Sequence, residues 1–176
     1  MTDAPSPDVE GVAPPALRDT FGQPWPCPPI VGPDASAWRG EVEAAWLVFL
    51  PGAFTPVCTS ELAWLAEMAV GFARAADEGG PRVGVRVISC DAAPVLRRVA
   101  EETGAPDELV LLSDFWPHGA AADHYGLLDR QTGRPRRVSV LVDADGVEHG
   151  RVTAEPGRAR TRTEHETVTE QWSANR

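Results

Sequence analysis

Cys58 closes the segment Pro51-Gly-Ala-Phe-Thr55-Pro-Val-Cys58, which directly follows the apolar run 45–50. An apolar run that ends at a proline predicts a buried strand, and apolar residues at helical spacing after Cys58 predict a helix. The cysteine then lies in the first turn of that helix, where unpaired N–H groups and the helix dipole favour thiolate over thiol. We therefore interpret Cys58 as a nucleophile, the alternative being a buried structural cysteine.

Two residues before Cys58 add to this interpretation. Thr55 can place its hydroxyl group beside the sulfur, and a threonine at this position can also cap the helix. Pro51 lacks an N–H group, so it can shield a pocket from water without offering a competing donor. We expect both residues to line the site around Cys58.

Pro51, Thr55 and Cys58 fill the fixed positions of Pro-x-x-x-Thr-x-x-Cys, the active-site signature of the peroxiredoxins. Segments 113–126 and 136–146 also resemble this family, in particular its AhpE-like single-cysteine branch, and the resemblance covers roughly residues 17–152. The family belongs to the alkyl hydroperoxide reductase and thiol-specific antioxidant superfamily. The resemblance implies a thioredoxin-like fold and a thiol-dependent peroxidase.

The resemblance also assigns two charged residues. In the family, an arginine on the strand before a Val-Asp-x-x-Gly turn reaches the catalytic sulfur, and Arg137 has this register ahead of Asp143. Glu61 matches a family glutamate that orients the arginine, whereas Arg136 would face the other side of the strand. A guanidinium is always charged and has several donors, so it can hold a thiolate and a peroxide oxygen together. Taken alone, Arg137 would be a surface residue and Glu61 a first-turn acid favoured by the helix dipole.

The resemblance implies that the Cys58 thiolate attacks hydrogen peroxide or an organic hydroperoxide and becomes a sulfenic acid, which an external thiol or redoxin reduces. We expect no cofactor and no metal. One alternative is a thioredoxin-like redox-sensing or chaperone-type binding protein with little turnover. A cysteine phosphatase needs an arginine six residues after its nucleophile, and Trp64 occupies that position.

Two further cysteines, Cys27 and Cys90, are about thirty residues away from Cys58 on either side, a spacing that fits neither a zinc site nor a disulfide framework. Cys90 follows one expected strand and precedes a helix, so it is the candidate for a resolving thiol at the same sheet edge as Cys58. The resolving cysteines of the family lie elsewhere, and we favour a structural role for Cys90. Cys27 stands in a proline-rich segment and is at most a surface thiol.

The composition fits one soluble domain, because the chain has 176 residues of which 43% are hydrophobic. A net charge of −10 argues against nucleic acid or an anionic membrane as a partner. No apolar run is long enough to span a membrane, and the N-terminus lacks the basic and apolar parts of a secretory signal. We expect a cytoplasmic protein that forms a homodimer.

The pattern of elements predicts the fold. A hairpin is expected over 17–25, further strands over 45–50, 83–89, 109–113, 137–142 and 147–152, and helices over 58–76, 93–102 and 119–125. This alternation with a final hairpin predicts an α/β fold of thioredoxin type, with a mixed sheet flanked by helices and an N-terminal hairpin. We expect a disordered tail over 1–15, the peroxiredoxin domain over 16–153, and a polar C-terminal segment over 154–176 with a loose helix or none.

Overall fold

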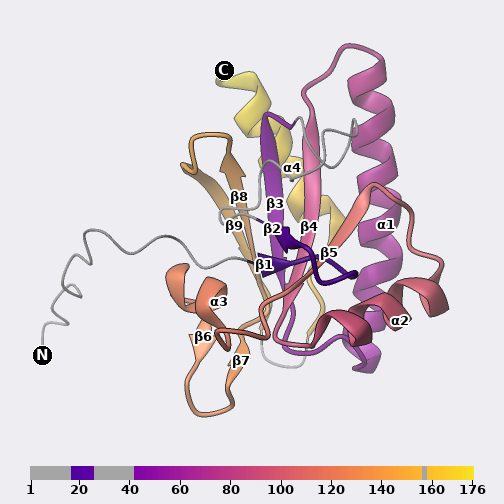
Figure 1. Cartoon of the computed structure of the whole chain (residues 1–176). Helices are drawn as coiled ribbons and strands as arrows, with labels where there is room; N and C mark the ends of the chain where they lie inside the picture. The colour runs from indigo at the N-terminus through magenta and orange to yellow at the C-terminus, as the bar shows by residue number, and fades with distance from the viewer. Residues whose placement is uncertain (1–16, 26–41, 156–157) are drawn as a thin grey trace, which may run out of the picture.

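The structure, a computed structural model, describes residues 17–25, 42–155 and 158–176. Its main sheet has seven strands in the order β2-β1-β5-β4-β3-β8-β9 (Figure 1). The three central strands run parallel to one another, β8 is antiparallel to its neighbour β3, and β9 is antiparallel to β8, so the sheet is mixed. These strands are β3 (Ala44–Phe49), β4 (Val83–Ser89), β5 (Leu109–Ser113), β8 (Val138–Asp143) and β9 (Glu148–Thr153).

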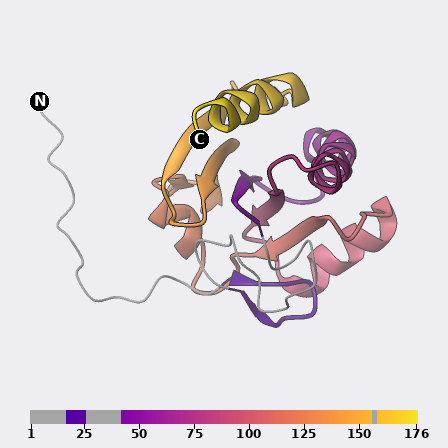
Figure 2. The same ribbon diagram turned by 90° about the horizontal axis from the view of Figure 1, so that it is seen from above.

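Helices cover both faces of this sheet. The face that carries Trp46 packs against α1 (Pro56–Asp77), α2 (Ala93–Thr103) and α4 (Arg162–Ala174). The opposite face packs against α3 (Ala120–His124), and the same core includes Leu17 of β1 (Leu17–Arg18) and Trp25 of β2 (Pro24–Trp25), the two strands at one edge of the sheet. Seen from above, α1 and α4 lie on the same side of the sheet (Figure 2). A separate two-stranded ribbon consists of β6 (Leu128–Asp129) and β7 (Arg134–Pro135).

The apolar run before Cys58 forms β3, and all six of its residues are buried. Alternate side chains enter the two cores, Trp46 and Val48 on one face and Leu47 and Phe49 on the other. A strand that is buried on both faces has a continuous apolar sequence, because neither side meets water. β3 lies between β4 and β8, so it is an interior strand, and the segment that follows its C-terminal end starts between the ends of these two neighbours.

The structure confirms the predicted mixed sheet with flanking helices and the hairpin over 17–25. Helix α1 begins at Pro56, two residues earlier than predicted, because proline fits the first helical turn and Thr55 caps it. The prediction that Arg137 lies within a strand is wrong: β8 begins at Val138. The backbone N–H of Arg136 donates instead to the carbonyl of Leu127, which ties the chain to the β6–β7 ribbon just before β8.

Helix α4 lies in the polar C-terminal segment 154–176, for which the sequence predicts a loose helix or none. A capping box between Thr161 and Glu164 starts it, and its buried face consists of His165, Thr169 and Trp172. Two of these three side chains are polar, so the helix has little apolar periodicity in sequence. Trp46 Nε1 donates to Thr169 Oγ1 at 2.9 Å, which anchors α4 to the centre of the sheet.

The predicted tail over 1–15, and Cys27, lie outside the described residues. The predicted domain limits remain predictions. Within the described ranges, none of the helices combines the length and the apolar character that crossing a membrane requires.

Candidate active site

The N-terminus of α1 positions Cys58 at the end of β3. Thr55 is the N-cap, and its Oγ1 accepts a hydrogen bond from the backbone N–H of Cys58 at 3.2 Å. The side chain of Cys58 is fully buried. The sulfur therefore lies in the first turn of a 22-residue helix, where backbone dipoles stabilise a negative charge.

Arg137 reaches this sulfur from the start of β8. Its Nη2 group donates to Cys58 Sγ at 3.3 Å, and its Nη1 group donates to Glu61 Oε2. Antiparallel pairing explains the approach, because Ser139 of β8 lies opposite Val48 of β3. The residue before β8 is thereby brought to the C-terminal end of β3, where α1 begins. Glu61 lies one helical turn after Cys58 and on the same face of α1.

Arg160 completes the cluster, and no pattern in the sequence indicates this role. It is buried, its backbone N–H donates to Glu61 Oε1 at 2.7 Å, and its Nη2 group donates to Glu61 Oε2 at 2.9 Å. Its Nη1 group donates to the carbonyl of Phe49 at 3.1 Å and to Ser139 Oγ at 3.0 Å. In sequence, Arg160 is one of several arginines in a polar segment without apolar periodicity, so no local signal separates it from solvated neighbours.

The electrostatics of this cluster depend on Glu61. Burial opposes its ionisation, but hydrogen bonds and charge from Arg160, with Arg137 beyond, outweigh burial and hold the pKa of Glu61 below its ordinary value. Two guanidinium groups then face one carboxylate, leaving one positive charge in excess while Cys58 is a thiol. A thiolate supplies the second negative charge, so the cluster is electrically balanced only when the sulfur is ionised.

Behind Arg160, a polar chain continues to α4. Ser139 Oγ lies 2.8 Å from Nε2 of His165, whose Nδ1 lies 2.7 Å from the carbonyl oxygen of Thr161. Burial, followed by the charge of Arg160, lowers the pKa of His165 to about 4, so its imidazole is neutral at physiological pH. Neither Ser139 nor His165 has a distinguishing signal in the sequence, because a serine in a strand and a histidine in a polar segment are both common.

The loop 51–55 that precedes Cys58 is fastened to the end of β4. The backbone N–H of Ala53 donates to Asp91 Oδ2 at 2.8 Å, and the same oxygen accepts from Ser89 Oγ at 2.9 Å. Pro51 lies in this loop between two clefts. A cleft of about 380 Å³ also includes Arg137, and one of about 410 Å³ also includes Thr55 and Cys90. The predicted residues Pro51, Thr55 and Arg137 therefore line these two clefts, and Arg137 also contacts the sulfur.

Cys90 is free and partly buried, and it lines the second cleft, whereas Arg137 lines the first. Burial, with additional repulsion from Asp114 and Asp91, raises the pKa of its thiol to about 12. It therefore stays protonated at neutral pH and is a poor nucleophile. Arg136, the neighbour of Arg137, is exposed and donates to the carbonyl of Gly126, away from the sulfur.

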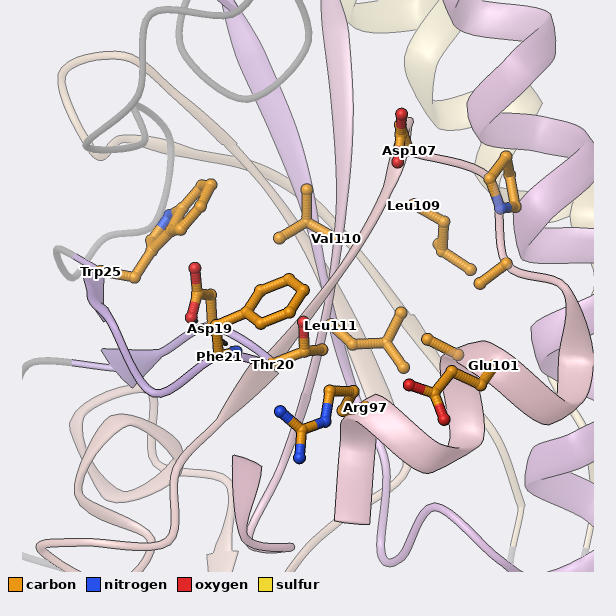
Figure 3. Close-up of a pocket in the computed structure, with 13 residues that line it drawn as sticks. Asp19, Thr20, Phe21, Trp25, Arg97, Glu101, Asp107, Leu109, Val110 and Leu111 are labelled. Atoms are coloured by element: carbon orange, nitrogen blue, oxygen red, sulfur yellow. Dashed lines mark hydrogen bonds between the residues drawn. The ribbon is translucent and has the colours of Figure 1, made fainter. Parts of the chain in front are cut away.

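Another cleft lies away from this cluster, between the β1–β2 hairpin, β5 and α2 (Figure 3). It has a volume of about 320 Å³, an apolar floor that includes Leu111, and charged groups such as Arg97 and Glu101 at its side. Among the described residues that line it, none is a predicted site residue. In the described parts of the chain, no group of three or more His, Cys, Asp or Glu residues is arranged to hold a metal ion.

Comparisons with known proteins were consistent across sequence and structure. The sequence profile of the AhpC/TSA family matches residues 34–148. Alkyl hydroperoxide reductase E from Mycobacterium tuberculosis is 34% identical over 114 residues, which make up 65% of this chain and 69% of that protein. The protein of the same name from Mycobacterium bovis is also 34% identical over 114 residues.

Two solved structures have the same fold. Peroxidoxin BcpB from Mycobacterium tuberculosis superposes with a TM-score of 0.70 at 22% identity and covers 92% of each chain. AhpC from Enterococcus faecalis superposes with a TM-score of 0.66 at 23% identity, over 91% of this chain and 87% of that one. At these identities the structural likeness establishes the fold alone.

Proposed function

The chain belongs to the AhpC/TSA family, the peroxiredoxins, and from that premise we propose that Cys58 is the residue that attacks the peroxide. The protein is a thiol-dependent peroxidase of AhpE-like type. The observation that carries the assignment of Cys58 is the contact of 3.3 Å from Arg137 Nη2 to its sulfur. It joins a cysteine at a helix N-terminus to a permanent cation, the combination that a reactive thiolate requires.

In the proposed reaction, the Cys58 thiolate attacks the nearer oxygen of a hydroperoxide. An S–O bond forms as the O–O bond breaks, the sulfur becomes a sulfenic acid, and the second oxygen leaves with the bonding electron pair. That oxygen takes a proton from solvent and departs as water or an alcohol. The sulfur is oxidised and the peroxide is reduced, so the step needs no metal or organic cofactor.

Arg137 and Thr55 act on the oxygen atoms in this step. Arg137 does not lose a proton, so its guanidinium stabilises the negative charge that passes from sulfur to the leaving oxygen. Thr55 Oγ1 accepts the Cys58 N–H, and its hydroxyl still has a proton to donate to a peroxide oxygen. Pro51 shields one side of the site, and Glu61 holds Arg137 at the sulfur. We assign Cys58, Thr55, Arg137 and Pro51 to the reaction and Glu61 to positioning.

A thiol reductant must then return the sulfenic acid to the thiol. We propose that this thiol comes from outside the chain, either a small thiol or a redoxin. The raised pKa of Cys90, about 12, supports this proposal, because a protonated thiol attacks a sulfenic acid slowly. A cytoplasmic location fits the same chemistry, since thiols are kept reduced there.

A homodimer is supported by exposed aromatic side chains at the sheet edge that bears the active site. Phe54 in the loop before Cys58 is 55% exposed, and Trp116 after β5 is 75% exposed. Exposed aromatic groups of this size are typical of protein interfaces. Sedimentation analysis of the wild type and of Trp116→Asp tests the dimer, which the charged substitution is expected to weaken.

Peroxide consumption per mole of protein, measured with an external thiol in excess, tests the enzymatic function. We expect many turnovers with hydrogen peroxide or an alkyl hydroperoxide. A redox-sensing or chaperone-type binding protein would consume about one equivalent and stop, and the family assignment does not favour that alternative.

A further inference from the structure

Helix α4 contacts the reactive cluster through one hydrogen-bonded path that the proposed function does not use. The path runs from His165 through the Ser139 hydroxyl to the Arg160 guanidinium and on to Glu61. The side chains of Ser139, Arg160 and His165 are all buried, with exposed fractions of 0%, 2% and 0%. Solvent therefore cannot replace a lost partner at these positions without rearrangement.

The acceptors along this path fix the direction of every hydrogen bond. The Thr161 carbonyl can only accept, so Nδ1 of His165 carries the ring proton and donates across the 2.7 Å contact. Nε2 of the neutral ring then has a lone pair and accepts the hydroxyl proton of Ser139 across 2.8 Å. With its proton used in this way, the Ser139 oxygen presents lone pairs to Arg160 Nη1 at 3.0 Å.

The surroundings of His165 keep the ring neutral and fixed in orientation. Trp46 packs against it with a centroid distance of 4.6 Å, and Trp64 does so at 5.1 Å. The charged groups that act on the ring are Arg160, Glu61 and Glu164, and the positive charge of Arg160 disfavours a second proton. A protonated ring would present an N–H group to Ser139 and reverse the hydrogen bond on which Arg160 depends.

We propose that His165 is a positioning residue for the peroxidase reaction, which acts through Ser139 on Arg160 and thereby on the Glu61–Arg137 pair at Cys58. His165 orients the Ser139 hydroxyl, Ser139 fixes one arm of Arg160, and Arg160 places Glu61 so that Arg137 faces the sulfur. This inference rests on the proposed role of Cys58. It gives the C-terminal helix a part in the reaction rate in addition to its packing.

Stopped-flow measurement of Cys58 oxidation by peroxide, followed by tryptophan fluorescence, tests the proposal. His165→Leu removes both polar atoms of the ring, and Ser139→Ala removes only the hydroxyl group, so the second variant serves if the first does not fold. We expect each to lower the second-order rate constant about tenfold, because misplacing a reacting group by a fraction of an ångström has effects of this size. In the double variant, the rate constant is expected to fall no further than in the single variants, because both residues act through the same path.

Two further variants separate positioning from packing. His165→Gln retains an acceptor within reach of Ser139 and is expected to recover most of the rate. Thr169→Val removes the hydrogen bond from Trp46 on the same buried face of α4, so it is expected to lower stability without changing the rate constant. The proposal is overturned if folded Ser139→Ala reacts at the wild-type rate, or if Thr169→Val slows the reaction as much as His165→Leu does. Loss of Cys58 reactivity is measured separately with Cys58→Ser, so a failure of the proposed function is distinguishable from a failure of this inference.

Discussion

Arg137 and Arg160 donate to the same oxygen atom of Glu61, Oε2. They flank the β8–β9 hairpin in sequence, Arg137 before β8 and Arg160 after β9, and the two strand ends meet at the open end of the hairpin. One buried carboxylate thus joins two guanidinium groups, only one of which contacts Cys58. Arg160 fixes the carboxylate of Glu61, and the carboxylate in turn fixes Arg137. The geometry makes the reactivity of Cys58 depend on residues that never touch the sulfur.

Replacing Glu61 tests this dependence. Glu61→Gln keeps the size of the side chain but leaves Arg160 buried without a carboxylate, and breaking a buried ion pair in this way costs about 3–5 kcal/mol. We expect a fall of that order in the free energy of unfolding, measured by urea titration, and slower oxidation of Cys58. Glu67→Gln is the control on the same helix, because Glu67 is 71% exposed in its pair with Arg162 and such pairs contribute about 0–1 kcal/mol. Equal losses in the two variants would contradict the central place of Glu61.

Arg137 and Arg136 offer a matched pair of neighbours. Arg137→Ala removes the cation at the sulfur and is expected to lower the rate constant for peroxide by on the order of 100-fold, the scale of losing one preorganised donor. Arg136→Ala removes an exposed side chain that donates to Gly126 and is expected to leave the rate within about twofold. Stopped-flow fluorescence measures both. Similar losses in the two variants would mean that general positive charge, and not the contact at Cys58, supports the reaction.

The pKa of His165 predicts how stability changes with pH. Its value is lowered from 6.5 to about 4 in the folded protein, so between these values the unfolded chain binds a proton that the folded chain does not. The contribution of His165 to the free energy of unfolding is therefore fully present above pH 6.5 and is lost as the pH falls toward 4. The total loss is about 3 kcal/mol. Urea unfolding at several pH values is expected to show a smaller decline in His165→Gln than in the wild type. Parallel curves for the two proteins would exclude this role for His165.

The sequence predicted the parts of the site that lie in one continuous segment. Pro51, Thr55 and Cys58 follow an apolar strand and precede an amphipathic helix, so strand, cap and helix could be derived from local pattern. Only the family resemblance identifies Arg137, by its register ahead of Asp143, and the predicted strand begins one residue earlier than β8. The backbone there is held by the β6–β7 ribbon, a tertiary contact that local pattern does not reveal.

Arg160 and His165 could not be predicted, for a different physical reason. Their burial is made possible by partners that are distant in sequence, Glu61 for the arginine and Ser139 for the histidine. A buried charged residue has the same sequence signature as a solvated one, because hydrophobic periodicity records only apolar partners. The sequence does not predict helix α4 firmly for the same reason, because two of its three buried side chains are polar.

The source of the reducing thiol gives a further prediction. The Cys27→Ser, Cys90→Ser double variant is expected to turn over with an external thiol at close to the wild-type rate, because Cys90 remains protonated at neutral pH. The assay is steady-state peroxide consumption at saturating thiol. A loss of turnover in the double variant, with Cys58 oxidation itself unchanged, would mean that one of these cysteines resolves the sulfenic acid.

Mass spectrometry of the wild-type protein after one equivalent of peroxide, with dimedone present as a sulfenic acid trap, tests directly whether Cys58 alone reacts with peroxide. We expect a single dimedone adduct on the peptide that contains Cys58 and no intramolecular disulfide. With excess peroxide and no trap, the same cysteine should carry two additional oxygen atoms, as a sulfinic acid. A dimedone adduct on Cys90 or Cys27, or a peptide that links Cys58 to Cys90 with the loss of two hydrogens, would contradict a single-cysteine peroxidase centred on Cys58.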